Sequence, residues 1–94
     1  MIRAEGNRLS LSGPLTITTV AGMMEEGREH VAGADRVVDL SGVTQVDSAA
    51  LALLLSWVRV AKSAGRQLSI DHAPSALVSL ASLYDVDSIL PLAP

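Results

Sequence analysis

The chain has 94 residues, enough for one domain over residues 1–94 and too few for two. Hydrophobic residues make up 49% and charged residues 18%, which is typical of a folded globule and excludes a disordered chain. A net charge of −3 and the lack of any run of Lys or Arg argue against nucleic acid as a partner. The absence of cysteine excludes disulfides and thiolate metal sites.

The first third of the chain predicts two strands and a helix. Residues 2–5 form a weak strand, and residues 8–12 alternate polar and apolar side chains as a half-buried strand does, until Gly13-Pro14 ends it. A helix is predicted over residues 16–32, with Thr16 as N-cap and Gly33 at its end. Its apolar stripe consists of Ile17, Val20, Met24 and Val31.

The rest of the chain predicts two further strand and helix pairs. A central strand over residues 36–40 is followed by a loop over 41–47, a helix over 48–64, a strand over 67–71 and a third helix from Pro74. Two strand–helix–strand crossovers imply parallel pairing. We therefore expect an α/β domain whose mixed sheet has a parallel centre and an antiparallel N-terminal hairpin at its edge, with helices mainly on one face.

The second helix carries more apolar surface than one sheet face can cover. Its apolar arc is roughly twice the ~100° typical of a surface helix. Either neighbouring helices cover the remainder, or one flank that includes Leu53 and Trp57 is a docking face. Trp is enriched in binding hot spots, yet Trp57 is also explained as a core residue with its N–H at the rim.

The turn into that helix has the most specific composition. Asp47 or Ser48 can cap the helix, and the free N–H groups of a helix start tolerate an anion such as a phosphate on Ser48. The small side chains of Ala49 and Ala50 allow another backbone to approach closely. Taken alone, the residues are better explained by a plain helix cap.

Three segments of the sequence resemble the STAS domain family. Residues 39–43, Asp-Leu-Ser-Gly-Val, and residues 46–51, Val-Asp-Ser-Ala-Ala-Leu, are similar to its signature, and residues 11–15, Leu-Ser-Gly-Pro-Leu, match its early strand. The resemblance covers essentially the whole chain. It implies a non-catalytic interaction domain in which Ser48 takes the place of the family's contact or phosphorylation residue.

Within this family, the chain most resembles the STAS subunits of Mla-type phospholipid ABC transporters. The similarity lies in residues 46–48 and 51–55, in Ala61-Lys62 and Gly65, and near the end in Leu83-Tyr84 and Leu90-Pro91. It implies a cytoplasmic accessory subunit that binds and stabilises or regulates the transporter ATPase, peripheral to the inner membrane through that complex. The alternative is an anti-sigma factor antagonist that an anti-sigma factor kinase switches by phosphorylating Ser48. The partner-binding residues expected are Asp47, Ser48, Ala49, Ala50, Leu53 and Trp57.

Sequence motifs of catalysis are not found. There is no phosphate-binding G-x-x-x-x-G-K-[ST] loop and no G-x-S-x-G elbow around Ser48. His30 and His72 are the only histidines and make a weak case for a metal. We expect no enzyme activity, cofactor or metal, and, without an apolar signal region or membrane span, no direct membrane insertion.

Overall fold

The computed structural model describes residues 1–93 and confirms the predicted order of elements. They are β1 (Ile2–Glu5), β2 (Arg8–Leu15), α1 (Ala21–Gly33), β3 (Arg36–Val46), α2 (Ser48–Ser63), β4 (Leu68–Asp71) and α3 (Ser75–Leu83). The sheet order is β1-β2-β3-β4, with β1 antiparallel to β2 and the other pairs parallel. The predicted α/β class with a parallel centre and an antiparallel edge is therefore confirmed.

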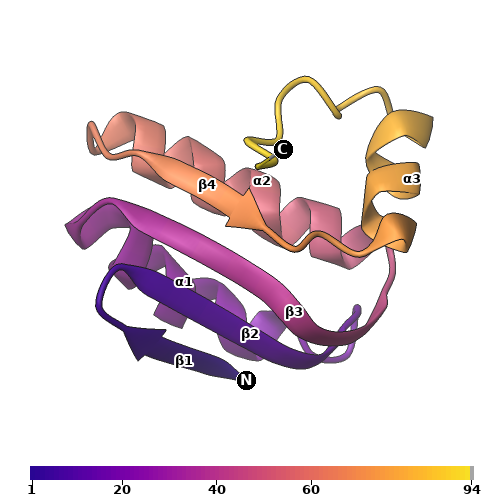
Figure 1. Cartoon of the computed structure of the whole chain (residues 1–94), viewed down its shortest axis with the longest axis horizontal. Helices are drawn as coiled ribbons and strands as arrows, with labels where there is room; N and C mark the ends of the chain where they lie inside the picture. Colours follow the sequence, from indigo (N-terminus) through magenta and orange to yellow (C-terminus); the bar gives the residue numbers. More distant parts are fainter. Residues whose placement is uncertain (94) are drawn as a thin grey trace.

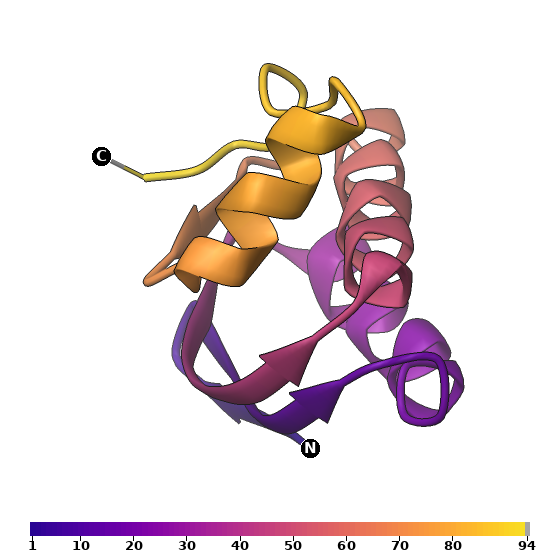
Figure 2. The same ribbon diagram turned by 90° about the vertical axis from the view of Figure 1, so that its right-hand side faces the viewer.

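The sheet and the helices form two layers. Helices α1 and α2 lie behind the strands in Figure 1, and α3 lies at the end to which the parallel strands run, as the rotated view shows (Figure 2). Alternation along each strand turns one set of side chains toward the helices and the other toward solvent. The buried set consists of Leu9, Leu11, Leu15, Val38, Leu40 and Ile70.

The wide apolar arc of α2 is covered by its neighbours, because α1 packs on one flank and α3 on the other. Leu53 and Trp57 are fully buried, and the Trp57 indole Nε1–H donates to the carbonyl oxygen of Met24 on α1 at 3.0 Å. Gly27 leaves room for the Trp57 ring, since a Cβ at this position would overlap it. The expectation that one flank bearing Leu53 and Trp57 is exposed is wrong, because both side chains complete the core between α1 and α2.

The third strand is twice as long as predicted. The residues expected to form a loop, 41–46, continue β3 and pair with Ser12, Gly13 and Leu15 of a correspondingly longer β2. Pro14 is tolerated because β1 pairs only as far as Leu11, so this part of β2 has no second neighbour that needs its N–H. The two register irregularities in this region accommodate the turn-forming residues.

The first helix begins at Ala21, five residues later than predicted. Residues 16–20 form a turn in which Thr19 Oγ1 accepts from the Thr16 N–H at 2.9 Å and donates to the Pro14 carbonyl at 2.8 Å. These side-chain bonds compete with a helical ladder. Ile17, assigned to the buried stripe, is consequently 74% exposed.

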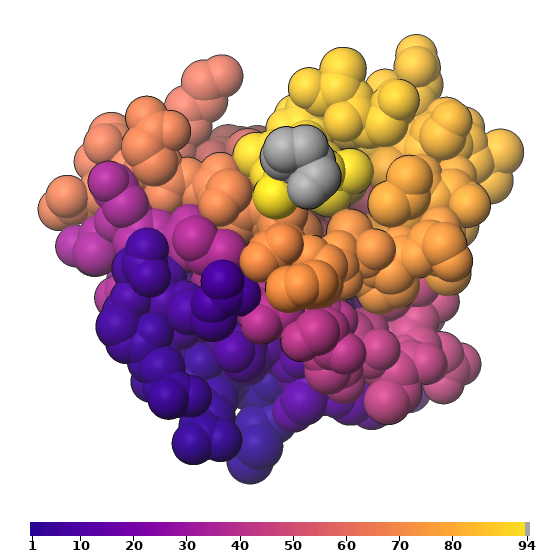
Figure 3. Space-filling view, in the orientation of Figure 1, coloured from indigo at the N-terminus to yellow at the C-terminus, as the bar shows by residue number. Residues whose placement is uncertain are grey.

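The C-terminal segment protects the outer edge of the sheet. The Ile70 N–H donates to the Pro91 carbonyl, the Ala93 N–H donates to the Ile70 carbonyl, and Leu92 forms a parallel bridge with Ile70. The space-filling view shows β4, α3 and this segment, in orange and yellow, over the upper part of the molecule (Figure 3). An edge strand covered in this way offers few free backbone groups to another chain.

A charged cluster lies on the solvent face of the sheet. Arg8 Nη1 lies 3.0 Å from Asp39 Oδ2 and 3.4 Å from Asp71 Oδ2, and His72 Nδ1 lies 3.2 Å from Asp39 Oδ1. The backbone N–H of Ser41, with smaller contributions from the side chains of Ser41, His72 and Arg8, lowers the pKa of Asp39 to about 2 against the opposing effect of burial.

The lowered pKa of Asp39 predicts a loss of stability in acid. A carboxyl whose folded pKa lies below its unfolded value stabilises the fold above the unfolded pKa and loses this contribution as the pH falls toward the folded pKa. We expect wild type to lose stability relative to Asp39→Asn between about pH 4 and about pH 2. Urea unfolding at several pH values measures the difference, with the exposed Asp87→Asn as control. A constant gap between wild type and Asp39→Asn across this range would contradict the prediction.

Candidate functional site

Ser48 lies at the end of the domain where the parallel strands finish. β2 ends at Leu15 and β3 at Val46, and these two residues are register partners, so the segments that follow them leave the sheet side by side. One segment is the turn with Ile17, and the other is Asp47 and the start of α2. Ligands and partners of open α/β sheets commonly meet this edge.

Asp47 joins these two segments through its carboxylate. Oδ1 accepts from the Ala49 N–H at 2.8 Å and thereby caps α2, while Oδ2 accepts from the Ile17 N–H at 3.0 Å. The Asp47 N–H also donates to the Leu15 carbonyl at 3.3 Å. Asp47 is therefore the cap of the helix, and the hydroxyl of Ser48 makes no hydrogen bond within residues 1–93. The side chain of Ser48 remains exposed.

Replacing Asp47 with alanine should reduce the free energy of unfolding by about 2 kcal/mol. The variant loses an N-cap, typically ~1 kcal/mol, and a second hydrogen bond of about the same net value. Ser48→Ala is the matched control and should change stability by less than ~0.5 kcal/mol, since it removes no internal hydrogen bond. Urea denaturation of the two variants measures both values, and equal destabilisation would show that Asp47 does not hold this end together.

An apolar hollow of about 330 Å³ opens beside Ser48. It lies between the first half of α2 and the residues that follow α3, and Tyr84 on its rim is 55% exposed. Its lining residues are Ser48, Leu51, Ala52, Leu55, Tyr84 and Val86. Open apolar hollows with a polar group at one end suit the insertion of a partner side chain.

The structure brings together only part of the predicted partner-binding set. Asp47, Ser48 and Ala49 lie at the surface or partly exposed, whereas Ala50, Leu53 and Trp57 are buried in the core. Ala50 lies within the first turn of α2, where its small side chain packs inward rather than toward a partner.

The exposure of Ile17 and the hollow that Tyr84 borders were not predicted. The spacing of Ile17 fits the buried stripe predicted for the first helix. The cluster of threonines at 16, 18 and 19 is a sequence signal that could have shifted the helix start and exposed Ile17. Periodicity offers no comparable signal for Tyr84, which is the residue that follows the last turn of α3.

The described residues contain neither a metal-ligand group nor a membrane-spanning helix. Across residues 1–93, no three His, Cys, Asp or Glu side chains cluster suitably for a metal ion. In the same range, no helix combines the length and the apolar character needed to cross a bilayer. His72 contacts Asp39 and Asp71, and neither histidine in the described chain hydrogen bonds to Ser48.

Two solved structures share this fold. A Thermotoga maritima protein assigned as an anti-sigma factor antagonist superposes with a TM-score of 0.79 at 16% identity, covering 98% of this chain and 83% of that one. The anti-sigma factor antagonist SpoIIAA, in its unphosphorylated form, gives a TM-score of 0.69 at 10% identity, over 88% and 81% of the two chains. At these identities the likeness establishes the fold.

Sequence comparison places the chain more narrowly. The chain is 34% identical over 87 residues to the intermembrane phospholipid transport system binding protein MlaB of Escherichia coli (strain K12), covering 92% of this chain and 89% of that protein. The family model described as "Mlab, STAS domain" matches residues 1–91. The chain therefore belongs to the MlaB-type STAS domain family.

Proposed function

We propose that this chain is the accessory STAS subunit of a phospholipid ABC transporter and that it binds the ATPase subunit through the Ser48 end of the domain. In this role it stabilises or regulates the ATPase from the cytoplasmic side and is peripheral to the inner membrane only through the complex. It has no catalytic activity of its own. The proposal is supported by 34% identity to MlaB over nearly the full chain, whose name assigns it to an intermembrane phospholipid transport system.

The observation that carries the proposal is the exposed Ser48 beside an apolar hollow on a rigidly built edge. Asp47 holds the Ile17 turn and the start of α2 together, so the surface has a fixed shape. Ile17 and Tyr84 are large apolar side chains exposed at 74% and 55%, and a partner that covered them would gain about 25 cal/mol for each Å² of apolar area removed from water.

Co-expression with the ATPase subunit of a phospholipid ABC transporter from the same organism tests the proposed function. We expect the two proteins to co-elute in size-exclusion chromatography and the complex to melt at a higher temperature than the isolated chain, because binding to the folded state stabilises it. Independent elution and an unchanged melting temperature would contradict the role as an ATPase-binding subunit. Hydrolytic or transferase turnover by the isolated chain that Ser48→Ala abolished would contradict its non-catalytic character.

The second candidate is an anti-sigma factor antagonist switched by phosphorylation. The exposed Ser48 hydroxyl at the start of α2 favours it, because a kinase can reach it and a helix N-terminus accommodates a phosphate. Phosphorylation of Ser48 by a kinase encoded beside this chain, with release of a sigma-factor regulator, would support this candidate. An ATPase and a permease encoded in the same place would support the transporter subunit.

A further inference from the structure

The basic side chains of the domain gather around the second half of α2. Arg59 and Lys62 lie on this helix and Arg66 follows it, while Arg28 on α1 lines one hollow together with Arg59. Three adjoining surface hollows lie here, and these four cations line them. Four of the seven Lys and Arg residues of the chain are thus collected here, whereas none of its ten carboxylates lines any of the three hollows. A chain with a net charge of −3 therefore has one distinctly positive region.

Two of these cations have no internal partner. Arg28 lies 3.7 Å from Glu25, and Arg66 Nε donates weakly to the Ala32 carbonyl at 3.5 Å. Within residues 1–93, Arg59 and Lys62 form neither an ion pair nor a side-chain hydrogen bond, and both are exposed. They are available to an external anion.

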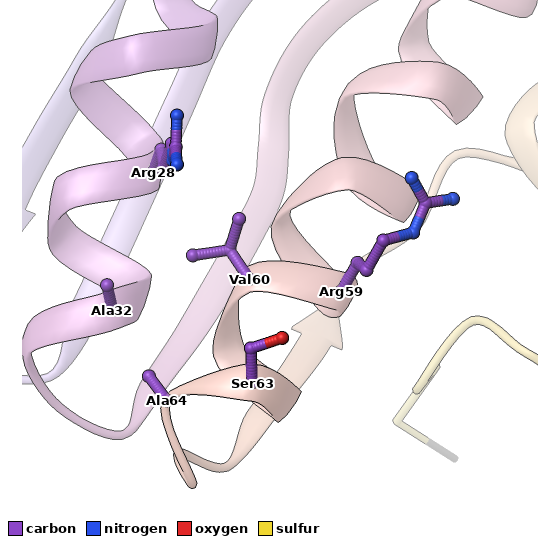
Figure 4. Close-up of a pocket in the computed structure, with 6 residues that line it drawn as sticks. All are labelled: Arg28, Ala32, Arg59, Val60, Ser63 and Ala64. Carbon is purple, nitrogen blue, oxygen red and sulfur yellow. The ribbon is translucent and has the colours of Figure 1, made fainter.

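Apart from Arg59 and Lys62, the groove that these two side chains share is lined by apolar residues. We call it the α2 groove; its volume is about 350 Å³ and its lining residues are Leu55, Val58, Arg59, Lys62, Val86 and Ile89. Ile89 is 56% exposed. Figure 4 shows Val60 pointing into the space between α1 and α2, whereas Arg59 points away from α1. The positive charge of Arg59 is therefore directed away from the hollow between the helices.

The α2 groove adjoins the hollow beside Ser48. Leu55 and Val86 border both, so apolar side chains follow α2 from Ser48 to Lys62, and we call this stretch the apolar track. A partner docked at the Ser48 end needs only a short extension to reach Arg59. The positive charges of Arg59 and Lys62 favour an acidic segment of the partner, and the aliphatic lining of the α2 groove favours aliphatic side chains on that segment.

A protein segment fits this track better than a membrane surface does. Anionic bilayers attract dense clusters of basic residues, and an overall negative chain is repelled by them. A groove lined by aliphatic side chains binds single apolar side chains of a peptide. Proteins that bind a bilayer instead insert protruding apolar or aromatic side chains into it. We propose that the α2 groove binds an acidic segment of the ATPase subunit that carries aliphatic anchors. This inference rests on the proposed function and names a second contact within the same complex.

Charge reversal in the groove tests the inference on the full-length chain and the purified ATPase subunit. We expect Arg59→Glu/Lys62→Glu to weaken binding about tenfold or more, with wild-type affinity falling as salt rises and the dependence on salt reduced in the variant. Arg3→Glu is the matched control for the single reversal Arg59→Glu, because both change the net charge equally and Arg3 is exposed on β1, outside the positive region. Arg59→Glu should weaken binding, whereas Arg3→Glu should bind as wild type does. Ile89→Asp should weaken binding without lowering the melting temperature.

Overlapping 15-residue peptides that cover the ATPase sequence locate the segment. We expect binding by peptides that combine Asp or Glu with Leu, Ile or Val, and loss of that binding with Arg59→Glu/Lys62→Glu. Wild-type affinity in this variant, or equal weakening by Arg59→Glu and Arg3→Glu, would overturn the α2 groove and leave the Ser48 contact intact. The proposal would also be overturned if Arg59→Glu/Lys62→Glu lost a binding to anionic phospholipid vesicles that wild type shows, while it still bound the ATPase subunit as wild type does. Absence of any complex with wild type would remove the proposed function itself.

Discussion

Replacing Gly27 with alanine should lower the free energy of unfolding by about 1–3 kcal/mol, the usual effect of overfilling a packed core. The new methyl group would overlap the Trp57 ring, so either the ring or the helix must move. The ring has little freedom, because it is fully buried and its N–H is bonded to Met24. Moving it leaves a buried donor without its partner or opens a gap between α1 and α2. Thermal and urea denaturation measure the loss.

The same helix provides the control. Gly22 is exposed and has nothing within 4 Å of an added Cβ, so Gly22→Ala should be neutral or stabilise the fold by up to about 1 kcal/mol through helix propensity. If the free energy of unfolding falls for Gly27→Ala and rises for Gly22→Ala, the difference is due to the packing of residue 27 against Trp57. If Gly27→Ala is as stable as wild type, then the two helices do not pack as closely as the structure indicates.

Ser48→Asp should abolish binding to the ATPase subunit while leaving the fold intact. The new carboxylate lies in the first turn of α2, where the helix dipole favours a negative charge by about 0.3–1 kcal/mol, so the melting temperature should be equal or slightly higher. An interface that covers this position must remove the carboxylate from water without a designed partner, and such burial is strongly unfavourable. We expect at least a hundredfold loss of affinity, equivalent to about 2.7 kcal/mol or more.

Ser48→Ala separates the charge from the missing hydroxyl. It should melt as wild type does, because Asp47 rather than Ser48 caps the helix, and it should bind much more tightly than Ser48→Asp. Calorimetric titration of both variants against the ATPase subunit gives the comparison. Wild-type affinity for Ser48→Asp would show that partners do not cover this turn, and Ser48 would then be an ordinary exposed residue beside the cap.

The fold was predictable where the hydrophobic periodicity and the positions of chain-breaking Gly and Pro residues agree. Short alternating strands and helices bounded by Gly or Pro determined the element order and the mixed sheet, because these signals are local. The length of β3 was not predictable, because Ser41-Gly42 and Gly13-Pro14 look like breaks. Only the pairing between β2 and β3 shows that each can remain extended next to the other.

The location of the candidate site was predictable from the sequence, but the set of residues exposed there was not. The Asp47-Ser48 turn stood out by composition and resemblance, and the structure places it at an accessible edge. Trp57 was placed among the partner-binding residues, with a core position as the alternative, because a helical wheel gives the width of an apolar arc and not what covers each flank. The structure confirms the core position. The covering element is α1, and the decisive residue is Gly27, whose missing side chain carries no hydrophobic signal.

The two hydrogen bonds that the Asp47 carboxylate accepts affect the thermodynamics of association. The two segments it joins are separated by 30 residues in sequence yet are ordered before any partner arrives. A surface of mobile loops would lose conformational entropy on binding, and that loss would be subtracted from its affinity. Here the ordering is already part of folding, so a modest contact area at this edge can sustain a stable complex. Asp47→Ala should therefore weaken association through a less favourable binding entropy, even though the residues that contact the partner are unchanged.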